Sequence, residues 1–223
     1  MDRIIDNYFN LQVMAGAFPD VLKGFGVTIL VTLLVIAVGM GAGLGLALLR
    51  SLRIRLVDLL IVIYIDAFRT LPQLVVIIVI YFGLPYAGLS LSPFVTMVFA
   101  LGAILSAFAA EIFWSAIMAV PPGQSDAAKA LGLSRLKTMA LVILPQAGRL
   151  ALPMLTNRAI AIGKGTALGT AVALPETLGQ AQSVMAIVAN PSPLTLAAMF
   201  YLALFIPLVA ASRVIEHKFG PGH

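Results

Sequence analysis

The sequence predicts an all-α membrane protein with about five transmembrane helices. Hydrophobic residues make up 61% of the chain and charged residues only 10%, whereas roughly a quarter of the residues in ordinary soluble domains are charged. The mean hydropathy is +1.06, and the apolar residues gather in runs that reach the ~20 residues needed for a helix to cross the hydrocarbon core. These observations exclude an ordinary soluble domain.

The apolar runs divide the chain into a short tail at 1–25, a membrane domain at 26–218 and a C-terminal tail at 219–223. The N-terminal tail is expected to lie outside or at the membrane surface and to be retained, because acidic residues interrupt it and no basic start leads into an apolar run. The expected spans lie near 26–49, 57–82, 93–118, 150–172 and 194–212.

The first span carries glycines that predict close helix packing. Gly39, Gly41, Gly43 and Gly45 place small residues four apart on two faces of one helix, and small residues let helix backbones approach each other in membranes. The fourth span is the least regular, since Pro153, Arg158 and Lys164 fall inside it.

The distribution of basic residues predicts the orientation of the spans. The connections at 83–92 and 173–193 contain no Lys or Arg. By the positive-inside rule, the opposite connections and the C-terminus are cytoplasmic and the N-terminus is outside. A nucleic-acid partner is not expected, because the basic residues are dispersed over separate loops. Those residues are Arg50, Arg53, Arg55, Lys129, Arg135, Lys137, Arg213 and Lys218.

A polar segment at 121–145 interrupts the apolar runs. Its prolines end the preceding helix, and Gln124, Ser125 and Asp126 are expected to cap a short new one. Gly132 suits the left-handed residue that closes a helix, and Ser134 suits the cap of a second one. Two short helices meeting at an angle are therefore predicted in a cytoplasmic loop at 120–142.

This loop resembles the "EAA" loop of the membrane subunits of ATP-binding-cassette (ABC) importers, with Asp126-Ala127-Ala128 standing for Glu-Ala-Ala and Gly132 at the expected spacing. Further stretches at 64–72, 81–85, 143–146 and 164–168 are similar to the permeases of that class that transport polar amino acids. The resemblance covers roughly residues 28–216.

The resemblance implies a type I ABC importer permease fold in a bacterial inner membrane. It implies two ATPase subunits on the cytoplasmic loops, a second membrane subunit that is either another copy or a similar chain, an external solute-binding protein and an amino acid substrate. ATP and Mg²⁺ belong to the ATPase partner, and this chain is expected to bind no cofactor. The residues assigned to coupling are Gly123, Gln124, Asp126, Ala127, Ala128 and Gly132.

Charged residues inside the predicted spans are the candidates for the transport path, because an ionisable group at mid-bilayer costs about 2.5 to 3.5 kcal/mol even on insertion scales. Depth along the helices places Asp66, Arg69, Glu111 and Arg158 at comparable levels, which predicts a buried cluster. Asp66 and Arg69 are three apart on one helix face and are able to neutralise each other. Pairs that only fix the bundle and a gate that breaks and reforms both remain open. Thr70 and Gln73 add uncharged polar groups to the same stretch.

Lys164 and Thr166 lie in Lys-Gly-Thr-Ala-Leu, where the similar permeases have Lys-Asp-Thr-Ser-Leu. Without the adjacent acid, a substrate carboxylate or Glu176 becomes the expected partner of Lys164. The alternative is a lysine that reaches the membrane interface while its stem covers apolar surface. Glu176 also belongs, with Gln180 and Gln182, to a polar cluster that is a plausible outer surface for an external partner.

The sequence gives no sign of an enzyme. It has no cysteine, and its two histidines are His217 and His223. The segment around Lys164 is not a phosphate-binding loop, because that loop needs Gly where Arg158 stands and Ser or Thr where Gly165 stands. No metal site is expected. Two alternatives to the importer subunit remain: a secondary transporter or channel subunit driven by an ion gradient, and a membrane scaffold without transport activity.

Overall fold

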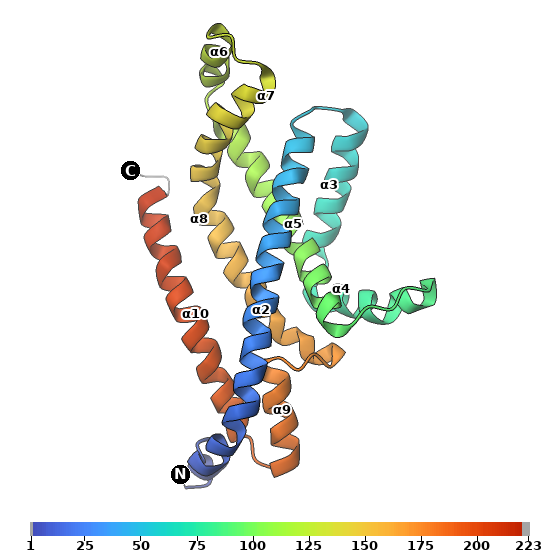
Figure 1. Cartoon of the computed structure of the whole chain (residues 1–223), viewed down its shortest axis with the longest axis vertical. Coiled ribbons are helices and arrows are strands. Elements are labelled where there is room, and N and C mark those ends of the chain that lie inside the picture. Colours follow the sequence, from blue (N-terminus) through green and yellow to red (C-terminus); the bar gives the residue numbers. More distant parts are fainter. Residues whose placement is uncertain (1, 220–223) are drawn as a thin grey trace.

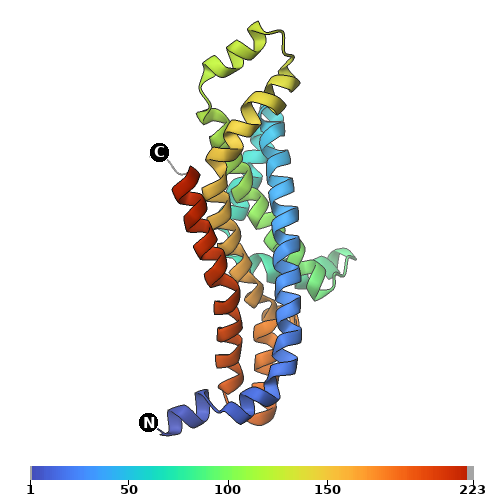
Figure 2. The same ribbon diagram turned by 60° about the vertical axis from the view of Figure 1, so that its left-hand side comes forward.

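Long helices determine the length of the molecule (Figures 1 and 2). The computed structural model describes residues 2–219. Within that range, four continuous helical stretches are long and apolar enough to cross a membrane, and a sharply bent pair makes a fifth candidate. They are formed by α2 (Leu11–Arg50), by α5 (Pro93–Ala119), by α7 (Arg135–Thr138) continuing through η3 (Met139–Ile143), α8 (Leu144–Gly163) and η4 (Lys164–Val172), and by α10 (Ser192–Phe219).

Helix α2 begins well before the predicted span at 26–49. It follows a short α1 (Asp2–Tyr8), and the Asn10 side chain caps it by accepting from the backbone N–H groups of Gln12 and Val13, both at 3.1 Å. At ~1.5 Å per residue its 40 residues span about 60 Å, roughly twice the hydrocarbon thickness. Most of the predicted N-terminal tail is therefore helical, because composition detects the apolar part of a helix and not its ends.

The predicted second span at 57–82 is not one straight crossing. Helix α3 (Arg55–Thr70) stops before Pro72, and α4 (Gln73–Ile78) leaves at 108° to it, continuing through η1 (Val79–Gly83) and η2 (Leu84–Ala87). Leu71 has ψ 136°, since the ring of a following proline disfavours helical geometry. The arm formed by α4, η1 and η2 projects sideways from the bundle (Figure 1).

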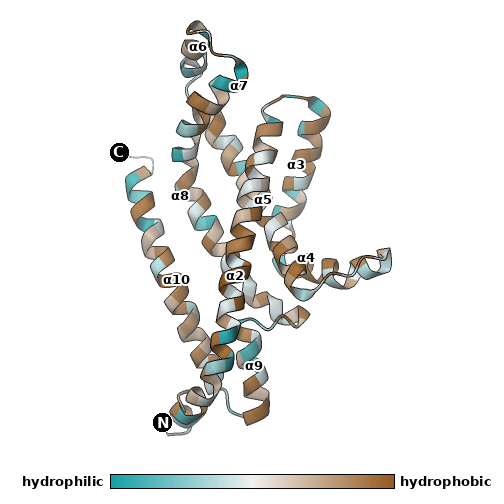
Figure 3. Ribbon diagram, viewed as in Figure 1, coloured by the Kyte–Doolittle hydropathy of each residue, from teal (hydrophilic) through white to brown (hydrophobic). Residues whose placement is uncertain are grey.

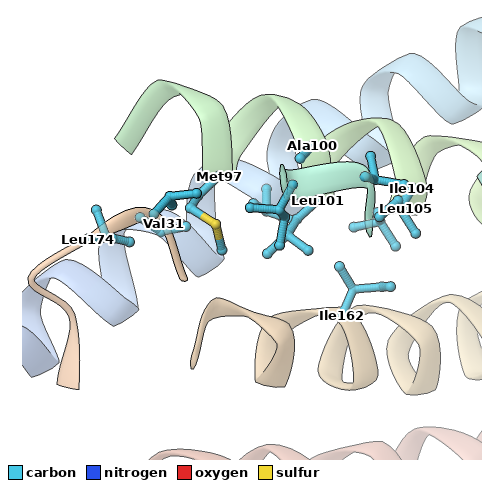
Figure 4. Close-up of a cluster of buried hydrophobic side chains, with 12 residues drawn as sticks. Val31, Met97, Ala100, Leu101, Ile104, Leu105, Ile162 and Leu174 are labelled. Carbon is cyan, nitrogen blue, oxygen red and sulfur yellow. The ribbon is translucent and has the colours of Figure 1, made fainter. Parts of the chain in front are cut away.

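The core forms where α2 and α5 pack together with the end of α8. Figure 4 shows Val31 of α2, five residues of α5 and Ile162 of α8 meeting in one cluster. A Cβ at Gly39 would lie 2.7 Å from Leu105, and one at Gly43 would lie 2.5 Å from Ala109. The predicted glycine packing is thus confirmed for that face of α2, while Gly41 and Gly45 face open space.

Hydrophilic residues lie at both ends of the molecule (Figure 3). One end carries α6 (Pro122–Ala130) and α7, where hydrophilic residues are frequent, and the other carries α9 (Thr177–Val188) and the N-terminus. The described end of α10 points toward the α6–α7 end (Figure 1). The predicted tail at 219–223 lies outside the described residues apart from Phe219.

Candidate functional site

The polar loop extends beyond the long helices as α6, a turn and α7 (Figure 2). Helix α6 begins at Pro122, not at the predicted caps, because Pro121 and Pro122 already fix the backbone of its first turn. Gly132 has φ +78°, and the Ser134 hydroxyl accepts from the Lys137 N–H at 3.4 Å. The predicted left-handed glycine and second cap are therefore confirmed.

The residues assigned to coupling form a continuous exposed surface on this loop, with Ala128 as the buried exception. The Ala128 carbonyl accepts from the Leu133 N–H at 3.1 Å, which closes the turn around Gly132. Gln124 accepts a long hydrogen bond from Gln146 of α8 at 3.4 Å, and Asp126 pairs with Lys129 at 3.2 Å. The loop is thus folded by its own contacts.

Leu131 is a residue of this loop that the sequence analysis missed. Its side chain is 83% exposed, at the end of the molecule farthest from α9. It is thus a large apolar side chain that projects from a polar loop. Its position directly before the turn glycine was the available signal.

Glu111 does not join the predicted cluster with Asp66, Arg69 and Arg158, because it pairs with Arg50. Arg50, at the end of α2, donates from Nη1 to Glu111 Oε2 at 3.2 Å and from Nε to Asp58 Oδ1 at 2.8 Å. Its guanidinium also lies 4.8 Å from the centre of the Trp114 ring. The prediction compared depths along the helices, and depth does not specify toward which neighbour a side chain points.

Arg69 and Arg158 do come together, over one phenyl ring. The guanidinium carbon of Arg158 lies 3.8 Å from the centre of the Phe108 ring, and that of Arg69 lies 5.4 Å from it. Among the described residues no ion pair joins Arg69 to Asp66, and neither arginine has a carboxylate within 4.0 Å. The predicted cluster thus reduces to two cations on an aromatic ring, with Asp66 exposed nearby on α3.

The bend of the second span lies against the irregular end of the fourth. A Cβ at Gly165 would collide with the amide oxygen of Gln73, so η4 lies directly against the end of this flexible side chain of α4. Thr166 is fully buried and donates to the Gly163 carbonyl at 2.9 Å. Thr70 is exposed at the end of α3. Of the predicted polar residues Thr70, Gln73 and Thr166, Gln73 is therefore the one whose side chain lies between α4 and η4.

Lys164 lines a groove of about 650 Å³ between η4 and α10. Its ammonium nitrogen lies 5.8 Å from the centre of the Phe205 ring, and Tyr201 and Arg213 line the same groove. No ion pair to Glu176 occurs in the part of the chain that the structure describes. Of the two partners expected for Lys164, Glu176 is therefore not the one found, and a substrate carboxylate stays a prediction.

Glu176 lies inside the protein and not on an outer surface. Its side chain is 0% exposed and caps α9 by accepting from the N–H groups of Leu178 at 3.0 Å and Gly179 at 2.7 Å. Tyr201 donates to it at 2.5 Å and Thr28 at 3.4 Å. A carboxylate held by these donors ties α9 to α10 and α2.

The family profile described as "Binding-protein-dependent transport system inner membrane component" matches residues 36–220. The chain belongs to this family. It is 34% identical to the probable amino-acid ABC transporter permease protein YckA of Bacillus subtilis, and the alignment covers 79% of this chain and 78% of YckA. It is also 32% identical to the probable glutamine ABC transporter permease protein GlnP of the same organism, and that alignment covers 86% of this chain and 90% of GlnP.

Solved structures of ABC importers share the fold of this inner membrane component. The crystal structure of an amino acid ABC transporter with histidines matches 92% of this chain and 96% of its own, with a TM-score of 0.83 and 30% identity. The MetNI methionine ABC transporter matches 93% of this chain and 96% of its own, with a TM-score of 0.67 at 20% identity, which speaks for the fold alone. The predicted resemblance to ABC importer permeases is thus confirmed.

Proposed function

We propose that this chain is the membrane subunit that forms the translocation path of an ATP-driven importer for amino acids. It lies in the bacterial inner membrane as a multi-pass protein, with the N-terminus outside and the α6–α7 loop and C-terminus in the cytoplasm. The positive-inside distribution of Lys and Arg supports this orientation. A secondary transporter or channel subunit driven by an ion gradient and a membrane scaffold without transport activity are less well supported, because relatives covering most of the chain are named as ABC permeases.

The proposal that the substrate is an amino acid rests on the two arginines near the Phe108 ring. Two guanidinium groups near one ring, with no carboxylate within 4.0 Å among the described residues, make an anion-binding site of the kind that a carboxylate fits. The relatives are named for glutamine, cystine and arginine, whose shared anionic group is the α-carboxylate. We therefore assign Arg158 and Arg69 to that carboxylate, with Gln73 and Lys164 farther along the path.

The substrate assignment is tested by uptake of labelled amino acids into cells or proteoliposomes that contain the assembled transporter. Arg158→Ala is expected to raise the half-saturating concentration about tenfold or more, because a hydrogen bond to a charged group contributes about 1.5 to 3 kcal/mol. Arg149→Ala removes an exposed arginine from the same helix α8 and serves as the matched control. Equal uptake by both variants, at equal amounts in the membrane, would remove Arg158 from the path.

The α6–α7 loop is the part of the chain to which we assign the contact with an ATPase partner. We assign Leu131 and the exposed coupling residues to docking of an ATPase subunit, which supplies ATP hydrolysis with its own Mg²⁺. Gly123, Gln124, Asp126 and Ala127 form the surface of α6, while Ala128 and Gly132 fix its shape. A second membrane subunit completes the path, and a solute-binding protein delivers the substrate on the outer side.

The docking assignment is tested by gentle affinity purification from native membranes followed by mass spectrometry. Leu131→Asp is expected to lose the ATPase subunit, because it replaces an exposed apolar contact with a charge. Ile54→Asp makes the same change at another exposed residue, at the start of α3, where an acidic cap suits a helix. Retention of the ATPase by Leu131→Asp, or uptake that follows an ion gradient and not ATP, would contradict the assignment.

A further inference from the structure

Two grooves meet at Arg135, at the α6–α7 end of the bundle. One of them, about 620 Å³ and called the polar groove below, is lined by Arg53, Lys129, Arg135 and Ser125 together with apolar residues of α5 such as Trp114 and Ile117. The other, about 600 Å³, is apolar and lies between the end of α2 and the α7–η3 segment, with Leu48, Leu49, Leu136 and Met139 among its lining residues. Arg135 and Ser51 line both grooves. The basic residues of one groove thus lie beside the apolar lining of the other.

The polar groove carries an excess of positive charge. Lys129 is paired with Asp126 at 3.2 Å. Arg53 and Arg135 have no carboxylate within 4.0 Å in the described part of the chain. Arg135 is held in place by a hydrogen bond from Nη2 to the Ser51 carbonyl at 2.8 Å, which fixes one side of the groove. The remaining guanidinium N–H groups are suited to a phosphate.

The backbone at Arg53 supports a function for its side chain. Arg53 has φ +59°, a left-handed conformation that is unfavourable for an L-residue and that glycine adopts without strain. The connection between α2 and α3 therefore keeps a basic side chain where the backbone alone favours glycine. Strain of this kind is often found where a side chain has to be presented to a ligand.

The apolar groove has room for a hydrocarbon chain. Gly45 lines it, and no atom lies within 4 Å of the position that a Cβ would occupy there. Leu136, at the mouth of the groove, is 79% exposed. The groove runs along helices that are apolar enough to cross a membrane, so an acyl chain of the surrounding lipid can enter it from the side.

We propose that one anionic phospholipid binds at these joined grooves. Its phosphate lies between Arg53 and Arg135, and one acyl chain follows the apolar groove past Gly45. The charge of the polar groove selects an anionic headgroup, and the adjoining apolar groove selects a lipid over a free phosphate. The bound lipid fastens the end of α2 to the base of the α6–α7 loop. This inference does not depend on the proposed substrate or partners.

The binding is tested by native mass spectrometry of the full-length chain, with its associated subunits, after exchange into micelles containing phosphatidylglycerol or phosphatidylcholine. Preferential retention of phosphatidylglycerol is expected. Arg53→Gly should reduce that retention about fivefold, the effect of removing one basic residue from an anionic membrane surface. Its thermal stability should stay equal or rise, because glycine relieves the left-handed backbone. Equal retention of the two lipids by the unmodified protein would overturn the proposal.

The acyl chain is tested by filling the apolar groove. Gly45→Leu places a side chain in the groove and should reduce phosphatidylglycerol retention as strongly as Arg53→Gly does. Gly41→Leu is the matched control, because Gly41 lies one turn away on α2, also has open space around its Cβ position and does not line the groove. Displacement of the lipid by inorganic phosphate, or an unchanged retention in Gly45→Leu, would show a headgroup site without the groove and would overturn the proposal.

Discussion

Two charged sites of this protein are satisfied in opposite ways. Glu176, near α9, is fully buried and receives hydrogen bonds from two backbone N–H groups and from the Tyr201 hydroxyl. Arg69 of α3 and Arg158 of α8 both lie near the Phe108 ring, without an acidic partner among the described residues. The acid has its complement of donors within the chain, whereas the cations have only a ring.

This difference separates a structural charge from a binding charge. A buried ion is tolerated when hydrogen bonds replace its water, and the Glu176 site meets that condition with groups from α2, α9 and α10. A cation–π contact contributes only about 0.5 to 2 kcal/mol. A ring also accepts no conventional hydrogen bond, so the guanidinium N–H groups of both arginines can still donate to a ligand. Glu176 should therefore govern stability, and the arginines should govern transport.

Removing the Glu176 carboxylate should have the largest effect on the fold. Glu176→Ala leaves the Tyr201 hydroxyl and the first N–H groups of α9 without an acceptor, which is expected to cost roughly 2 to 4 kcal/mol. Thermal unfolding of the purified protein in mild detergent measures the loss. Glu176→Gln keeps one acceptor oxygen and should fall between Ala and the unmodified protein. A variant Glu176→Ala that unfolds at the original temperature would show that the network is not needed.

The approach of α2 to Glu176 offers a milder way to break the same site. A Cβ at Gly24 would lie 2.6 Å from the Glu176 carbonyl oxygen, so Gly24→Ala should force the two segments apart at a cost of about 1 to 3 kcal/mol. Gly26→Ala is the control, since its Cβ meets no atom within 4 Å. That change should stabilise the helix by up to about 1 kcal/mol. Opposite shifts of the unfolding temperature are therefore expected, and equal shifts would contradict the close contact.

The smallest expected effect concerns the Phe108 ring at the site of the two arginines. Phe108→Leu removes the ring that both arginines contact and should reduce uptake severalfold, while the free energy of unfolding falls by only about 1 kcal/mol. Phe94→Leu removes a ring of the same helix that packs on the same core and is expected to lower stability equally without changing uptake. If both variants transport alike, the ring does not position the arginines.

Much of the fold was predictable because composition and breaker residues report directly on helices in lipid. The apolar runs located the long helices, and Gly132 and Ser134 located the turn and second cap of the polar loop. The prolines at 121 and 122 began α6 earlier than its polar residues suggested. Pro72 signalled a disturbance, but the angle of 108° depends on how α4 packs against η4 and α5, which no local pattern contains.

The candidate site was less predictable, because sequence gives the depth of a residue along a helix but not its direction. Arg158 and Arg69 were grouped correctly by depth, whereas Glu111 at similar depth turned to Arg50. Glu176 was placed outside because its segment follows a span, yet the chain folds back and buries it. Sidedness and burial depend on the packing of α2, α5 and α10 around each other, and that packing arises only in three dimensions.

Helix α2 joins the Glu176 contact at Gly24 to the Arg50 contacts with Asp58 and Glu111. The distance along the axis between these residues is about 40 Å. A rod of that length, pivoting at one end by about 5°, moves its other end by about 3 Å, the full length of a hydrogen bond. A small tilt at the Glu176 end is thus amplified into a displacement large enough to break the Arg50 contacts, without any change in the helix itself.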